Sequence, residues 1–483
     1  MAFSSFTKFN NSKPNFYKTQ SSVHSSSSKK QNKPKTTTLD HTFSSIVAGI
    51  MSPVTGANIP LLPGSKVSSE PAATVSGAVF NVATSIIGAG IMSLPATLKV
   101  LGVIPAFVLI LVIALLAEIS VDFLMRFTHS GETTTYAGVM REAFGPLGAV
   151  ATQLCVVITN LGCLIMYLII IADVLSGNKP DGEVHLGLLQ QWFGIHWWNS
   201  REFALVITLI FILLPLVLYR RVESLKFSSA VSTLLAVAFV TICSVLAIIA
   251  LVEGKTQTPR LVPRLDHETT FFDLFTAVPV IVTAYTFHFN VHPIGFELGK
   301  PSDMTTAVRI ALILCAIIYF SIGLFGYLLF GDATQSDILI NFDNNADSSF
   351  GSLLNTLVRL SYAFHVMLAF PLLNFSLRTN IDEFFFPKRP LLASDNKRFV
   401  AITLVLLVFS YIAAVAIPDI WFIFQFMGST SAVCLAFVFP GSIVLRDIHG
   451  ISTRKDKIIA LVMVILAVVT SVIAVANNIY NLF

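Results

Sequence analysis

Charged residues are scarce in this sequence of 483 residues, where they make up 12% of the total. A soluble globular domain carries about 25% charged residues. The chain is 54% hydrophobic, with a mean hydropathy of +0.77. So much apolar surface needs lipid around it, which excludes an ordinary soluble protein. The composition predicts an all-α membrane protein, a single polytopic bundle.

Cysteine is also rare, and its positions do not suit disulfide formation or metal binding. All five cysteines fall inside apolar runs: Cys155, Cys163, Cys243, Cys315 and Cys434. Neither a disulfide framework nor a metal-ligand spacing occurs in the sequence. The sequence also lacks a phosphate-binding P-loop and a nucleophile–base constellation. We therefore expect no enzyme, no metal and no cofactor, and any transport must run on an ion gradient rather than on nucleotide hydrolysis.

Runs of about 17–25 apolar residues predict eleven membrane-spanning helices. They cover about 72–97, 102–126, 147–175, 203–219, 227–252, 273–297, 306–330, 351–377, 397–417, 420–445 and 457–481. Most of the 31 Lys and Arg residues fall on one side of the membrane if the N-terminus is cytoplasmic. Positive residues resist translocation, so this asymmetry fixes the predicted orientation. It also explains the basic N-terminus without a nucleic-acid site.

Residues 1–70 form a polar segment rich in Ser, Lys, Asn and Thr, with Asp40 and Glu70 as its only acids. Such a segment cannot bury enough apolar surface to fold alone. We predict a disordered cytoplasmic tail followed by a transmembrane domain over 71–483. An organelle transit peptide is the alternative, because transit peptides are Ser-rich and acid-poor.

Two predicted spans carry Gly, Pro and polar residues at mid-length. The first contains Gly88-Ala-Gly90 and closes with Ser93-Leu-Pro95, and the second is interrupted by Asn290, His292, Pro293 and Gly295. Irregular backbone at membrane depth survives only where it is buried in protein or lines a cavity. Paired interruptions in two halves point to a transporter binding site. Their separation of five spans predicts inverted repeats over about 71–252 and 273–445, with an extra helix at about 457–481.

An unwound helix offers poles of both signs, with free carbonyls at the end of one half and free N–H groups at the start of the next. A free amino acid is a zwitterion that needs both poles. We therefore predict that substrate contacts come from Thr84, Ser85, Gly88, Ala89 and Gly90 in the first break and from Tyr285, His288, Asn290 and His292 in the second. Close packing of helices is the alternative reading of Gly-Ala-Gly.

Ionisable residues inside spans cost about 2.5–3.5 kcal/mol at the bilayer centre, so each needs a reason. Glu297 ends the second broken span, and His365 lies inside the eighth span. Both are candidates for proton coupling, and a histidine titrates near neutral pH. An internal ion pair for Glu297 and simple packing for His365 are the alternatives. Asp173, at the end of the third span, is expected to be solvated.

The first broken span, Phe80-Asn-Val-Ala-Thr-Ser-Ile-Ile-Gly-Ala-Gly-Ile-Met-Ser-Leu-Pro95, resembles the opening signature of the amino acid/auxin permease family. The sixth span resembles the family's pattern at His288, Pro293-Ile294 and Glu297-Leu298. The resemblance covers about residues 70–480. It implies a LeuT-like fold of eleven helices, with an amino acid bound between spans one and six.

The sequence of the first span is most similar to that of plant AVT-type vacuolar amino acid transporters. That resemblance implies a vacuolar membrane and movement of amino acids from lumen to cytosol, and some of the group prefer acidic amino acids. The related animal sodium-coupled neutral amino acid transporters tend to carry Asn where this chain has Thr84. They also carry hydroxyl residues where Met367 and Ala369 precede Pro371 here. We therefore expect proton coupling, with sodium left open.

The sequence thus predicts a secondary active amino acid transporter that works by alternating access. Its implied partners are a small amino acid substrate and the lipid bilayer, with no nucleic acid and no obligate protein. An amino acid sensor that signals through the tail is a second hypothesis, and an auxin-like small-acid carrier is a third. The plasma membrane and the plastid envelope are alternative locations.

Overall fold

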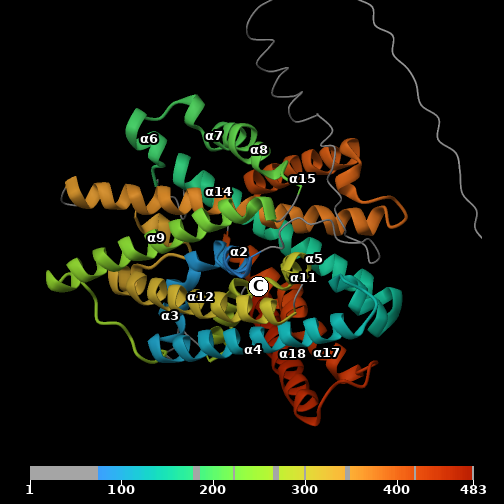
Figure 1. The fold of residues 1–483 in the computed structure, drawn as a ribbon. Coiled ribbons are helices and arrows are strands. Elements are labelled where there is room, and N and C mark those ends of the chain that lie inside the picture. The colour runs from blue at the N-terminus through green and yellow to red at the C-terminus, as the bar shows by residue number, and fades with distance from the viewer. Residues whose placement is uncertain are drawn as a thin grey trace, which may run out of the picture. The chain divides into compact units, whose positions relative to one another are not determined.

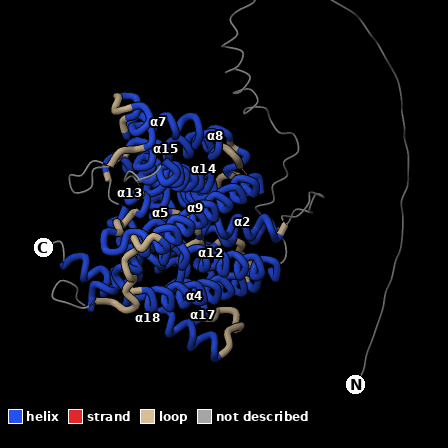
Figure 2. The backbone as a smooth tube through the Cα atoms, turned by 90° about the vertical axis from the view of Figure 1, so that its left-hand side faces the viewer, coloured by secondary structure: helices blue, strands red, loops and turns tan. Residues whose placement is uncertain are grey.

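A computed structural model describes residues 74–177, 185–220, 223–264, 271–298, 301–342, 349–417 and 420–480. The chain divides into two units, Met1–Ser68 and Ser69–Phe483, and every described residue belongs to the second. The described residues form helices joined by loops and contain no β-strand (Figure 2). The predicted disordered tail lies outside the described residues.

Nine helical segments of the described chain are long and apolar enough to cross a membrane. They are α4 (Val103–Ser130), α5 (Tyr136–Ser176), α9 (Lys226–Val252), the segment Phe271–Leu298, α12 (Pro301–Phe330), α14 (Ser349–Phe385), α15 (Asn396–Ala416), the segment Ile420–Arg446 and α18 (Arg454–Tyr480). A tenth is a bent pair, α2 (Val75–Ile86) with the helical stretch Ala89–Leu101. The stretch comprises η1 (Ala89–Ser93) and α3 (Leu94–Leu101).

The remaining predicted span, 203–219, is a shorter and less regular helical run. It consists of α7 (Arg201–Thr208), the π-turn η4 (Leu209–Leu213) and α8 (Leu214–Val217). Pro215 in the first turn of α8 has no N–H to donate, and the π-turn before it accommodates that loss. The count of eleven spanning helices is therefore not confirmed, and the five-plus-five arrangement stays a prediction.

Helix α5 begins well before the predicted third span. Thr135 caps it, because its Oγ1 accepts a hydrogen bond from the Gly138 N–H at 3.1 Å. The helix then kinks at Gly145, whose φ of 71° suits glycine, and continues from Pro146. The predicted start at residue 147 is thus the start of the second half of this helix.

The interrupted helices lie at the centre of the described unit. Helix α2 packs against α9 and α12, and α14 packs against α5 and α9 (Figure 1). In the most apolar window of Phe271–Leu298, 78% of the residues are buried, against 22% for Arg454–Asn477 in α18. Neighbouring helices therefore shield the irregular backbone from lipid, as a broken span requires.

Candidate functional site

The first break lies where Gly-Ala-Gly predicted it. Helix α2 ends at Ile86 and η1 begins at Ala89, while Ile87 and Gly88 are extended. The two halves are bent by 50°. A Cβ at Gly88 would lie 2.2 Å from the hydroxyl of the buried Tyr167, so any larger residue there would have to displace that ring.

Three consecutive carbonyls at this break accept hydrogen bonds from side chains of other helices. The Tyr319 hydroxyl on α12 donates to the Ile86 carbonyl at 2.5 Å, and Tyr362 on α14 donates to that of Gly88 at 2.5 Å. Between them, Nε2 of His365 lies 3.0 Å from the Ile87 carbonyl. The carbonyls released by the break are therefore present, but they are not free as predicted, because three buried side chains donate to them.

The second break lies one turn upstream of its predicted position. Helix α10 (Ala277–Ala284) ends at Ala284, α11 (His288–Leu298) begins at His288, and the residues between them are not helical. The prediction that Asn290, His292, Pro293 and Gly295 interrupt the span is wrong, because they are all helical.

The helix tolerates Pro293 because of a substitute donor. Pro293 lacks the N–H that would reach the carbonyl of Phe289, four residues earlier. The Ser376 hydroxyl on α14 donates to that carbonyl at 3.3 Å instead. The backbone therefore stays wound at Pro293 and opens upstream, at residues 285–287.

The two breaks lie against each other. The Tyr319 hydroxyl is also 2.8 Å from the carbonyl of Ala284, the last residue of α10. A Cβ at Gly90 would lie 2.6 Å from Cβ of Ala284 and 2.8 Å from its Cα. Asn290 Nδ2 donates to the Ser85 hydroxyl at 3.0 Å, which joins the same two helices. The structure thus brings Asn290 against Ser85 and Gly90 against Ala284, and their contact with substrate stays a prediction.

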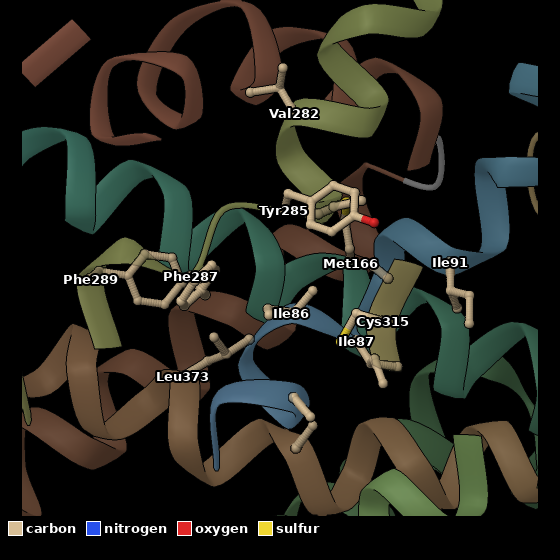
Figure 3. Packing of buried hydrophobic residues seen from close by; sticks show 14 of the residues in the cluster. Ile86, Ile87, Ile91, Met166, Val282, Tyr285, Phe287, Phe289, Cys315 and Leu373 are labelled. Carbon is tan, nitrogen blue, oxygen red and sulfur yellow. The ribbon is translucent and has the colours of Figure 1, made fainter. Parts of the chain in front are cut away.

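A buried hydroxyl at the second break, that of Tyr285, lacks a hydrogen-bond partner among the described residues. Tyr285 is fully buried, and its hydroxyl makes no hydrogen bond within the described residues. Figure 3 shows the ring among buried apolar side chains, with its oxygen toward the segment that carries Ile91. Within that segment, the Ile91 N–H donates to the Gly88 carbonyl at 3.2 Å. Buried polar groups are normally hydrogen-bonded, so the unpartnered Tyr285 hydroxyl calls for an explanation.

Three of the predicted contacts point elsewhere. The Thr84 hydroxyl donates to the Ser229 carbonyl of α9 at 2.9 Å. His288 and His292 face α4, where their Nε2 atoms lie 2.6 Å from Ser120 Oγ and 2.9 Å from Thr128 Oγ1. Glu297 is half-buried near the end of α11. The structure therefore directs the side chains of Thr84, His288 and His292 away from the carbonyls of the first break.

The loop after α12 lies over the far half of the first broken helix. The Ser93 hydroxyl of η1 donates to the Ser336 carbonyl at 2.7 Å. The next residue, Asp337, is 2% exposed and caps the short helix α13 (Ile338–Asn341) through the Leu339 N–H at 2.9 Å. Burial raises the pKa of Asp337 to about 7, and nearby Asp173 adds to the rise, while the Leu339 N–H and Arg359 oppose it.

The expectation that Asp173 is solvated is wrong. Its side chain is 5% exposed and pairs with Arg201, at the start of α7. The helical run that begins at Arg201 packs beside α5, so the Asp173 carboxylate is buried against the Arg201 guanidinium and not exposed to water.

Sequence reasoning missed Tyr167, Tyr319, Tyr362 and Asp337. A tyrosine inside an apolar span needs a partner for its hydroxyl, and that was the available signal. Nothing in the spacing shows that the partners are unwound carbonyls far away in the chain. Within the described ranges, no group of three or more His, Cys, Asp or Glu side chains could hold a metal ion.

The chain is similar in sequence to known amino acid transporters. The family described as transmembrane amino acid transporter protein matches residues 71–483. The chain is 60% identical to amino acid transporter AVT6C of Arabidopsis thaliana, over 87% of this chain and 98% of that protein. It is 26% identical to sodium-coupled neutral amino acid transporter 7 of Danio rerio, over 76% of this chain and 77% of that protein.

Solved structures share the fold at low identity. MhsT in complex with L-phenylalanine matches with a TM-score of 0.57 and 15% identity, over 85% of this chain and 99% of that one. A manganese transporter mutant from Eremococcus coleocola matches with a TM-score of 0.56 and 14% identity, over 85% and 87%. These neighbours have the LeuT fold. The chain belongs to the transmembrane amino acid transporter family and is a multi-pass membrane transporter, not an enzyme.

Proposed function

We propose that this protein is a proton-driven secondary transporter that holds one free amino acid between its two broken helices and releases it by alternating access. The observation that carries the proposal is the Tyr319 hydroxyl, which lies within hydrogen-bond distance of the Ile86 and Ala284 carbonyls at once. A phenol has one proton and can serve only one of these acceptors at a time. The other carbonyl is a place for an ammonium group.

The opposite pole of a zwitterion also has a place. The Tyr285 hydroxyl is a buried donor without a partner, and its ring packs against that of Tyr319 with centroids 5.0 Å apart. A carboxylate is an acceptor that this hydroxyl can satisfy. The Tyr285 hydroxyl, a donor without an acceptor, therefore lies beside the carbonyl to which Tyr319 does not donate. The carboxylate and the ammonium group of an α-amino acid lie beside each other in the same way.

Proton coupling fits the contacts of the first break better than sodium coupling. Sodium is a hard cation that needs several oxygen ligands. The carbonyls of Ile86, Ile87 and Gly88 already accept from Tyr319, His365 and Tyr362. A sodium-coupled relative at 26% identity keeps the sodium alternative worth testing.

We further propose a vacuolar membrane, with the N-terminus cytoplasmic and transport from lumen to cytosol. The likeness of the first broken span to AVT-type transporters supports this location, and the distribution of Lys and Arg supports the orientation. A preference for acidic amino acids rests on the same resemblance.

Purified protein in liposomes tests the proposal directly. Each labelled amino acid is offered under an imposed pH gradient or an imposed sodium gradient, with ionophore-collapsed vesicles as the control. We expect accumulation of at least one amino acid under the pH gradient alone. Accumulation under the sodium gradient alone contradicts proton coupling, and no flux of any amino acid contradicts the proposal. Competition by aromatic acids that lack an amino group identifies a small-acid carrier.

A further inference from the structure

His365 joins three parts of the structure through one ring. Its side chain leaves α14 and is fully buried. Nε2 lies 3.0 Å from the carbonyl of Ile87, in the unwound stretch of the first broken helix. Nδ1 lies 2.7 Å from the main-chain carbonyl of Ser232 on α9. The imidazole therefore bridges the movable stretch and the packed helices behind it.

Both of those partners are carbonyl oxygens, which can only accept hydrogen bonds. A neutral imidazole has one N–H and can satisfy one of them, whereas the imidazolium has two and satisfies both. The Ser232 hydroxyl lies 2.9 Å from Nδ1 and 2.9 Å from the His365 carbonyl, and its one proton can serve either acceptor when the ring is neutral but only the carbonyl when the ring is an imidazolium. With a neutral ring, the Nδ1 lone pair faces the Ser232 carbonyl, and the contact between α9 and α14 has to lengthen.

The surroundings of His365 supply no fixed charge. Ile87 and Ser232, its contacts on α2 and α9, have no titratable side chain. On α14 the Tyr362 ring lies 5.0 Å away. Tyr167 of α5 and Tyr319 of α12 lie around the same unwound carbonyls. None of the ion pairs found among the described residues includes His365, so uncharged oxygens, those of the Ile87 and Ser232 carbonyls and of the Ser232 hydroxyl, surround an added proton.

We propose, on the basis of the transport function above, that His365 is the site that binds the coupling proton and that the proton holds the unwound Ile87–Gly88 stretch against α9 and α14. When the ring loses the Nδ1 proton, its bond to the Ser232 carbonyl breaks, and the stretch stays bonded to α14 through Nε2 but is no longer fastened to α9. Neutral imidazole takes up one proton from one aqueous side and gives it up on the other, so one proton moves in each cycle. The Ile87 carbonyl that the ring occupies is next to the Ile86 carbonyl, one of the two that share the Tyr319 hydroxyl at the proposed ammonium site, and this adjacency links the two events.

The test compares H365Q with the wild type in liposomes that contain a pH-sensitive dye. Glutamine keeps a hydrogen-bond donor and an acceptor, but its amide does not bind a proton between about pH 5 and about pH 8. We expect at least a tenfold loss of pH-driven accumulation and of substrate-dependent proton flux. Exchange of labelled for unlabelled substrate, at equal pH on both sides, persists at a measurable rate. H196Q is the matched control, because His196 lies in a surface loop where its ring contacts the Phe193 carbonyl.

The outcomes separate this inference from the proposed function. Proton-coupled accumulation by H365Q at the wild-type level overturns the role of His365 and leaves the transporter intact. A wild type that exchanges substrate but ignores the pH gradient overturns proton coupling itself. If H365Q loses exchange as well, nitrogen NMR of the histidine rings in the wild-type protein decides. A ring that stays neutral between about pH 5 and about pH 8 overturns the inference, and an imidazolium signal that H365Q lacks supports it.

Discussion

The break between α2 and η1 and the break between α10 and α11 lie against each other, but neighbouring helices hold them differently. At the first break, side chains of α12 and α14 donate to the carbonyls of Ile86, Ile87 and Gly88. At the second, the Ala284 carbonyl shares the Tyr319 hydroxyl, the Thr286 hydroxyl donates to the Val282 carbonyl at 2.6 Å, and the Tyr285 side chain is held by ring packing. The first break is thus fixed by side-chain hydrogen bonds from two other helices. Apart from Tyr319, the second is fixed by bonds within its own segment, by Asn290 to Ser85 and by aromatic contact.

This difference suggests a division of labour between the two helices. Exchangeable hydrogen bonds give the first helix a way to change state with the cargo, because each bond can pass from a side chain to a bound ligand. Apolar packing has no such substitute, so the second helix provides the wall against which the first one moves. The following experiments test this difference, beginning with the change of largest expected effect.

Gly90 to Ala is expected to have the largest effect. The added Cβ would overlap both Cβ and Cα of Ala284, and backbone cannot move aside as a flexible side chain does. Separating the two breaks by about 1 Å should lower transport by at least about 100-fold, measured as initial uptake in liposomes. G295A on α11 is the control, because there the new Cβ meets the flexible end of Met125 at 3.2 Å. Equal activity of the two variants would contradict the close contact of the breaks.

Asp337 to Asn tests whether the loop over η1 responds to pH. The carboxyl has its pKa raised from 3.8 to about 7 in the folded protein, so its proton favours the folded loop and the stability from it is lost as pH rises between those values. Thermal unfolding of the wild type should shift down by roughly several degrees over that range. D337N should flatten the curve.

The control for that experiment is D332N in the same loop, since Asp332 is exposed and pairs with Arg260. Its curve should follow that of the wild type. A D337N protein with an unchanged pH dependence would show that the carboxyl is not buried against Asp173.

Tyr319 and Tyr285 allow a direct comparison, because each loses only a hydroxyl on conversion to Phe. Y319F leaves the Ile86 and Ala284 carbonyls without a donor and should cost about 1–3 kcal/mol of stability. Y285F removes an unpartnered buried hydroxyl and should leave stability unchanged or slightly higher. Y285F should nevertheless raise KM, since the substrate carboxylate loses its donor. Equal melting temperatures for the two variants would argue against this assignment.

Deletion of residues 1–65 should have the smallest effect. The family match begins at residue 71, and both breaks lie beyond it. We expect the uptake rate to stay within about twofold of the full chain. A sensor that signals through the tail would instead keep amino acid binding and lose the capture of a partner, which pull-down with the full-length and shortened chains would reveal.

Periodicity and composition were enough to place most of the helices and the first break. Gly88 and Gly90 are informative in a sequence because an apolar run of this length has few other reasons to contain them. Pro293 misled the placement of the second break, because a proline interrupts a helix only when no other group serves the carbonyl it leaves free. That group is Ser376, on a helix distant in sequence.

The partners of the breaks could not be predicted in the same way. The donors to the first break lie on other helices, and their roles depend on how α12 and α14 pack against it. Tyr319 bonds to the Ile86 carbonyl, Tyr362 to that of Gly88 and His365 to that of Ile87. Sequence identifies a buried tyrosine as a residue that needs an acceptor, but the acceptor is chosen by tertiary structure. The orientation of His288 and His292 toward α4 depends on packing for the same reason.

The Tyr319 hydroxyl, placed between two main-chain oxygens, has a consequence for selectivity. Groups that recognise only the ends common to all amino acids carry no information about which one is bound. Discrimination then belongs to whatever surrounds the variable part of the cargo. A related carrier can change its preferred cargo through those surroundings and keep this tyrosine unaltered.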